Sequence, residues 1–162
     1  MAALAAAALL ALAPMSVRAA ALYNFTFTQT PGIGFPGGGV GDISGTFTVD
    51  AGVSPNRIIG ITGVTVLGAI TGLVPPSGTP GAPDNLFFPA GPFLSTGGVA
   101  FTDSFGQITL AYNAAADTYV AFRDSPSGIA SGTLTVTAVP APAALALFGL
   151  GLVGLALARR RR

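Results

Sequence analysis

The stretch from Leu22 to Gln29 reads LYNFTFTQ, and the stretch from Ser131 to Ala138 reads SGTLTVTA. In the first stretch Phe25 and Phe27 alternate with polar residues, and the second stretch alternates in the same way. A period of two in aromatic and β-branched residues is typical of a strand with one face toward a core. These two stretches therefore predict β-strands near the two ends of one domain.

The same alternation recurs between them. Further stretches with this pattern are SGTFTVD at 44–50, ITGVTVLG at 61–68, GVAFTD at 98–103, QITLAYN at 107–113 and TYVAFRD at 118–124. Glycine and proline clusters separate the stretches, and no helical period is sustained. We therefore predict an all-β domain over residues 22–138, an antiparallel β-sandwich or jelly-roll-like fold. Its expected inward-facing residues are Phe25, Phe27, Phe47, Val49, Ile108, Leu110, Leu134 and Val136.

The composition excludes several kinds of chemistry. The chain of 162 residues contains no cysteine, histidine, tryptophan, lysine or glutamate. Disulfides, thiolate metal sites and histidine-based catalytic triads are therefore excluded. Between Leu22 and Pro142 two arginines stand against six aspartates, a net charge of −4. A mildly acidic domain is a poor partner for a phosphate backbone, so we expect no nucleic-acid partner.

The first 21 residues have the layout of an export signal. Ala3 to Ala13 contains only alanine and leucine, and small residues follow near the predicted cleavage region of Ala19, Ala20 and Ala21. An apolar core of about 7–15 residues before small residues is typical of a secretory signal peptide. We therefore expect the secretion machinery and signal peptidase to process this segment. The alternative is an alanine-rich helix that stays with the domain.

The composition changes abruptly after the last predicted strand. Val139, Pro140, Ala141 and Pro142 precede sixteen apolar residues at 143–158. As a helix these would span about 24 Å, slightly less than a hydrocarbon core of about 30 Å. The arginine cluster that follows consists of Arg159, Arg160, Arg161 and Arg162. We therefore predict a transmembrane helix whose arginines stay cytoplasmic while the β domain lies outside.

Residues 139–162 resemble the PEP-CTERM sorting domain of exported bacterial proteins. The resemblance rests on Pro140, Pro142, the GLGL stretch at 149–152 and the arginine cluster. Ala141 stands where the family usually has glutamate between the prolines. The resemblance implies processing by exosortase, an integral membrane transpeptidase-like enzyme. The alternative is a simple single-pass anchor that no peptidase recognises.

No catalytic motif is apparent in the predicted β domain. Asp103-Ser104-Phe105 and Asp124-Ser125-Pro126 are interpreted as turns, and we expect no enzymatic activity and no cofactor. Calcium is the one metal that the oxygen-rich composition could serve, with Asp84 and Asn85 as weak candidate ligands. An Asx-turn role is favoured for these two residues.

Together these features predict an exported, exosortase-sorted protein of structural or binding type. We expect it to be anchored in the cell envelope, then released to the cell surface or extracellular matrix in association with exopolysaccharide. The alternatives are a lectin-like carbohydrate-binding module and, with less support, an Asp-dependent glycan hydrolase. A hydrolase would need two carboxyl groups about 5–10 Å apart in a cleft.

Overall fold

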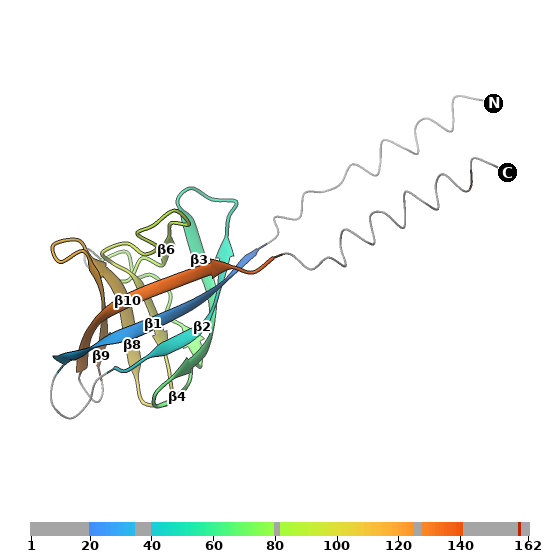
Figure 1. Cartoon of the computed structure of the whole chain (residues 1–162). Coiled ribbons are helices and arrows are strands. Elements are labelled where there is room, and N and C mark those ends of the chain that lie inside the picture. Colours follow the sequence, from blue (N-terminus) through green and yellow to red (C-terminus); the bar gives the residue numbers. More distant parts are fainter. Residues whose placement is uncertain (1–19, 35–39, 80–81, 125–127, 141–158, 160–162) are drawn as a thin grey trace, which may run out of the picture.

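The computed structural model describes residues 20–34, 40–79, 82–124, 128–140 and 159 (Figure 1). The described elements are strands: β1 (Ala21–Gly34), β2 (Ile43–Asp50), β3 (Asn56–Thr65), β4 (Gly68–Ala69), β5 (Gly72–Leu73), β6 (Leu86–Phe87), β7 (Val99–Thr102), β8 (Gln107–Asn113), β9 (Thr118–Arg123) and β10 (Gly128–Ala138). All the strand pairings are antiparallel, as the alternation predicts.

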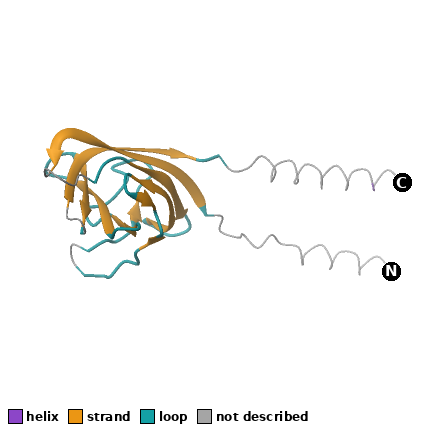
Figure 2. Ribbon diagram, turned by 90° about the horizontal axis from the view of Figure 1, so that it is seen from below, coloured by secondary structure: helices purple, strands orange, loops and turns teal. Residues whose placement is uncertain are grey.

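The strands form one curled sheet. Its order is β4-β3-β2-β1-β10-β9-β8-β7-β5, and β6 pairs with β3 off this path. Figure 2 shows the sheet wrapping around on itself as a half-barrel. The expectation of a sandwich with two separate sheets is therefore wrong for the described residues. The alternation signals which face of a strand is buried, and this signal is the same whether the facing wall is a second sheet or the same sheet curled back.

Short segments tie the two ends of the sheet together. Ile70 N donates to Gly63 O at 2.9 Å, while Thr71 N donates to Thr102 O at 2.7 Å. Ile70 and Thr71 are consecutive in the chain. Ile70 thus bonds to β3 near one end of the sheet, and Thr71 bonds to β7 near the other end. The backbone of Asn85 makes a second tie. Its backbone oxygen accepts a hydrogen bond from Ile58 N, and its backbone N–H donates to Gly98 O. These bonds leave little unpaired strand edge between β3 and β7, which protects the protein from edge-to-edge association.

The core fills the inside of the curl. Seven of the eight residues predicted to face inward are buried, and Val136 is partly buried against the same core. The rings of Phe25 and Phe47 stack with centroids 4.0 Å apart. The prediction of the inward face is confirmed.

Two inward-facing glycines make room for these rings. A Cβ at Gly45 would lie 3.0 Å from the Phe25 ring and 2.0 Å from the carbonyl oxygen of Thr62. A Cβ at Gly132 would lie 2.9 Å from the Phe27 ring. Each glycine follows a serine in an SGT triplet, so the same short sequence serves the same packing purpose in β2 and in β10.

Both predicted terminal helices fall outside the described residues. The signal segment up to residue 19 and the apolar run 143–158 are not described. Among the residues that are described, no helix is long and apolar enough to cross a membrane.

Candidate functional site

The predicted sorting segment begins where the folded domain ends. β1 and β10 pair along their length, with Tyr23 opposite Ala138. One further bond continues the ladder, because Val139 N donates to Leu22 O at 2.8 Å. Pro140, which is exposed, has no N–H with which to extend it. The chain therefore leaves the sheet at Val139, beside the start of β1 (Figure 1).

The residues of the two predicted processing regions lie partly within the described structure. Ala20 is exposed, and Ala21 opens β1 opposite Val49. Ala19 lies outside the described residues, as do Ala141, Pro142, Arg160, Arg161 and Arg162. Arg159 is described and exposed. The structure thus brings the end of the cleavage region and the beginning of the sorting motif to the same end of the β1–β10 pair.

The candidate calcium ligands Asp84 and Asn85 hold the half-barrel closed. Asn85 is buried with φ 55°, a conformation that asparagine tolerates better than most residues. Its Nδ2 donates to Val74 O at 2.9 Å and its Oδ1 accepts from Ala100 N at 3.3 Å. Its side chain therefore bonds to the β5 and β7 segments, while its backbone carbonyl bonds to Ile58 of β3.

The carboxylate of Asp84 likewise makes its hydrogen bonds within the domain. Its Oδ1 accepts from Leu86 N at 3.1 Å, which is the Asx turn predicted from the sequence. Ser95 Oγ lies 2.6 Å from Oδ1 and 2.7 Å from Oδ2. Within the part of the chain that the structure describes, no three aspartate, glutamate, histidine or cysteine side chains are grouped so that they could hold a metal ion. After this turn Phe87 packs into the core, whereas Phe88 is exposed.

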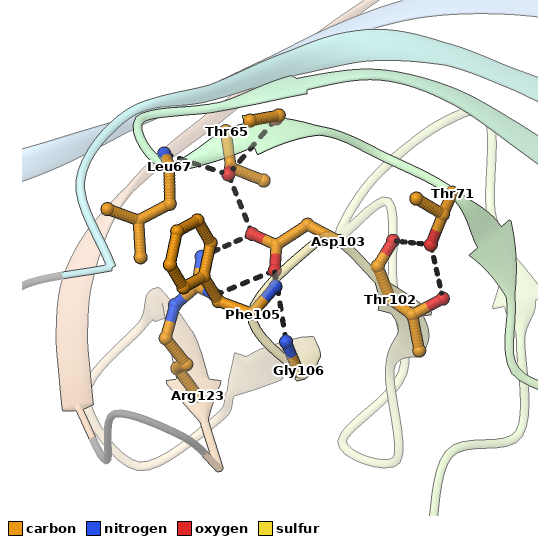
Figure 3. A network of polar contacts seen from close by, with 9 residues as sticks. Thr65, Leu67, Thr71, Thr102, Asp103, Phe105, Gly106 and Arg123 are labelled. Carbon is orange, nitrogen blue, oxygen red and sulfur yellow. Dashed lines mark hydrogen bonds and ion pairs between the residues drawn. The ribbon is translucent and has the colours of Figure 1, made fainter.

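A buried polar network that sequence reasoning missed lies at the other end of the half-barrel (Figure 3). Arg123 donates to Asp103 twice, from Nη1 to Oδ1 at 2.9 Å and from Nη2 to Oδ2 at 2.7 Å. Thr65 Oγ1 donates to Asp103 Oδ2 at 2.8 Å, and Phe105 N donates to Oδ1 at 2.9 Å. The predicted turn at Asp103 is therefore confirmed, but the same carboxylate also joins the end of β3 to the end of β9 inside the half-barrel.

The alternation of residues along β9 and at the end of β7 contained a signal for this network. Tyr119, Ala121 and Arg123 share one face of β9, and Ala121 and Arg123 are both buried. Phe101 is likewise buried at the position two before Asp103. Following the period of two to the ends of these strands would have placed one arginine and one aspartate inside together.

The ion pair fixes the ionisation of Asp103. Hydrogen bonds from Arg123 are the main reason that the pKa of the Asp103 carboxyl lies well below its usual range. Burial alone would raise this pKa, so the donated bonds outweigh desolvation. Arg123 Nε is buried and has no protein acceptor among the described residues. This carboxylate therefore stays ionised and paired, which is unsuited to general acid–base chemistry.

The outer surface of the sheet carries an ordered set of hydroxyl groups. Ten polar, uncharged residues that face outward on β10, β1, β2 and β3 form what we call the threonine face: Asn24, Thr26, Thr28, Ser44, Thr46, Thr48, Thr62, Thr133, Thr135 and Thr137. Leu22, Ile59, Val64 and Arg57 are exposed on the same strands. They stand in cross-strand rows, such as Thr135, Thr26 and Ser44. Neighbouring strands are about 4.8 Å apart, and successive outward residues on one strand are roughly 6.7 Å apart. The face is uncharged and is bordered by Asp42 and Asp50.

The comparison with known families addresses the tail. The family model described as the PEP-CTERM protein-sorting motif matches residues 138–162. The chain carries a PEP-CTERM sorting motif. None of the curated proteins and none of the solved structures matches the chain, so the half-barrel is interpreted from its own geometry.

The PEP-CTERM motif indicates an exported protein that is anchored in the membrane, with exosortase as its processing partner and the cell surface as its destination. Its first matched residue, Ala138, is also the last residue of β10. Folded domain and PEP-CTERM motif therefore meet within one residue, and Val139 belongs to both the strand ladder and the motif.

Proposed function

We propose that this protein is a non-enzymatic surface module that is delivered by the PEP-CTERM motif and associates with exopolysaccharide through its threonine face. The observation that carries the proposal is the combination of a sorting tail with the cross-strand rows of hydroxyl groups on the threonine face. Rows of hydroxyl and methyl groups suit a neutral polymer whose own surface alternates hydroxyl groups and C–H groups.

The order of events follows from where the domain ends. Signal peptidase removes the N-terminal segment, so that the mature chain begins between Ala20 and Leu22. The helix 143–158 then holds the chain in the membrane, with the arginine cluster on the cytoplasmic side. Exosortase acts on the segment from Val139 to Pro142, which leaves the sheet as exposed backbone at Pro140. The domain is then free to reach the cell surface or the extracellular matrix. N-terminal sequencing of the exported protein should begin between Ala20 and Leu22.

The arrangement of the carboxyl groups supports a non-enzymatic role. Asp103 is the one buried aspartate among the described residues, and it is paired with Arg123. Asp84 is held by Ser95, and Asp117 accepts from Tyr112 Oη at 2.6 Å. A glycan hydrolase needs one carboxyl group that gives up a proton near neutral pH. Asp103 is unsuited to this role, because the bonds from Arg123 hold the pKa of its carboxyl well below the usual range.

The test is binding of the domain of residues 20–140 to polysaccharides from the native host and to a glycan array. Thr26 and Thr135 are opposite one another on the threonine face, so the double variant Thr26→Glu/Thr135→Glu should lose binding. The matched control is Thr79→Glu/Thr96→Glu, which adds the same charge at exposed positions away from this face and should bind as wild type.

Three outcomes would change the proposal. Equal binding by both double variants would remove the threonine face from it. Tight binding to one defined oligosaccharide would favour the lectin-like alternative, and release of reducing sugars would favour the hydrolase.

A further inference from the structure

We propose that one rim of the half-barrel rests on the bilayer surface while the tail is in the membrane. The rim consists of Leu22 and of the turns 51–55 and 88–92, and we call it the membrane-proximal rim. The inference rests on the proposed membrane insertion of helix 143–158.

The register places these parts at one end of the molecule. Ala21 is opposite Val49, so the turn after β2 begins beside the start of β1. Asn56 at the start of β3 is opposite Phe87, so the turn that follows β6 lies at the same end. The rings of Tyr23 and Phe87 are in contact, with centroids 4.6 Å apart. The chain leaves the sheet toward its tail at this same end, where Val139 bonds to Leu22.

The rim is exposed, apolar and uncharged. Leu22, Val53 and Phe88 are 43%, 39% and 36% exposed. Every residue of 51–55 and 88–92 is exposed, and the two turns, AGVSP and FPAGP, contain no ionisable side chain. Exposed aromatic and aliphatic side chains without charge are those that enter the headgroup boundary of a bilayer most readily.

The length of chain before the apolar run restricts how far the rim can stand from the bilayer. Only Ala141 and Pro142 separate Pro140 from Ala143. Three fully extended residues span at most about 10 Å, and the headgroup layer on each side of the hydrocarbon is about 5–8 Å thick. With Ala143 at the hydrocarbon boundary, Pro140 lies within or just above the headgroups. The neighbouring turns are then close enough to touch them.

Contact at the rim would orient the domain, keeping the segment from Val139 to Pro142 at the surface where a membrane-embedded peptidase acts. A few apolar side chains give only weak, reversible adsorption. The domain is therefore expected to leave the bilayer once the tail has been removed.

The experiment uses tryptophan as a depth reporter, because the chain contains none. Phe88→Trp and Val53→Trp place the reporter on the rim. Phe105→Trp is the matched control, since Phe105 is 54% exposed and lies in the turn after β7 at the opposite end, where Asp103 bonds to Thr65. Each full chain is reconstituted into phosphatidylcholine vesicles with and without brominated acyl chains. Flotation measures anchoring, and emission wavelength and quenching measure contact with lipid.

We expect all three variants to float with the vesicles. The Phe88→Trp and Val53→Trp chains should then show blue-shifted emission and strong quenching, whereas the Phe105→Trp chain should show neither. Chains that float while the two rim reporters are no more quenched than the control reporter would overturn the membrane-proximal rim and leave the anchor intact. Chains that do not float would overturn the anchor, and the rim with it.

Discussion

Arg123 and Asp103 form a bidentate ion pair inside the half-barrel, and the side chains of both residues are fully buried. The pair joins the turn after β7 to the end of β9, and Thr65 adds β3 through its bond to the same carboxylate. The ends of β7 and β9, which have only β8 between them in the sheet, thus meet the distant strand β3 at one carboxylate. The pair is therefore placed to fix how tightly the sheet curls.

Removing the carboxylate should destabilise the domain strongly. Asp103→Ala leaves the buried Arg123 guanidinium without its partner, and breaking a buried pair in this way costs about 3–5 kcal/mol of unfolding free energy. Asp124→Ala is the matched control, because Asp124 is adjacent in sequence to Arg123 but exposed, and should change the value by less than about 0.5 kcal/mol. Urea unfolding of the domain of residues 20–140 measures both. Equal effects would show that the pair has no special role.

The Asp103–Arg123 pair also predicts how the stability of the folded domain changes with pH. The pKa of Asp103 is lowered in the folded protein, so the unfolded chain binds a proton first as the pH falls. The stabilisation is complete above the ordinary aspartate pKa of about 3.9 and declines below it. Asp103→Leu/Arg123→Met replaces the pair with apolar side chains and should fold with near wild-type stability at neutral pH. Urea midpoints should fall less steeply between pH 5 and pH 2 in this variant than in wild type; parallel curves would contradict the assignment.

The glycines under the phenylalanine rings should not tolerate a methyl group. Gly132→Ala places Cβ against the Phe27 ring and the carbonyl oxygen of Thr28, so overpacking should cost about 1–3 kcal/mol. Gly72→Ala is the control, because its Cβ would lie 3.9 Å from Thr102 Oγ1, an ordinary contact. Thermal unfolding of the two variants should separate them clearly. A Gly132→Ala domain as stable as the control would show that the ring does not need this space.

Much of the fold was predictable because burial on one face produces a period of two along a strand. That signal predicted the all-β class and the inward residues from Phe25 to Val136 correctly. It could not predict the single curled sheet, because the closing ties at Ile70, Thr71 and Asn85 are backbone bonds in segments without alternation. The sorting segment was predictable from the sequence, because the order of its prolines, apolar run and arginines resembles the PEP-CTERM pattern. The Asp103–Arg123 pair joins residues 20 positions apart at the ends of β7 and β9, beyond the hydrophobic part of each strand, so the turn at Asp103 was found and its partner was not.

Restoring glutamate between the two prolines should speed processing. Ala141→Glu gives the tail the residue that the PEP-CTERM pattern usually has at this position. Ala141→Gln is the control, with nearly the same size and no charge. Pulse–chase labelling in a host with exosortase should show faster conversion of the glutamate variant to the shorter form. Identical rates for the two variants and wild type would mean that exosortase does not recognise this position.

The most direct test of the account is the intact mass of the mature protein from a host with a working exosortase. We predict a population that lacks the apolar run 143–158 and the arginine cluster, with its new end between Val139 and Pro142. The same host without exosortase should retain the full tail, which shows that ordinary proteolysis is not responsible. If every molecule recovered from the exosortase-containing host still ends at Arg162, the tail is only an anchor and the sorting account is wrong.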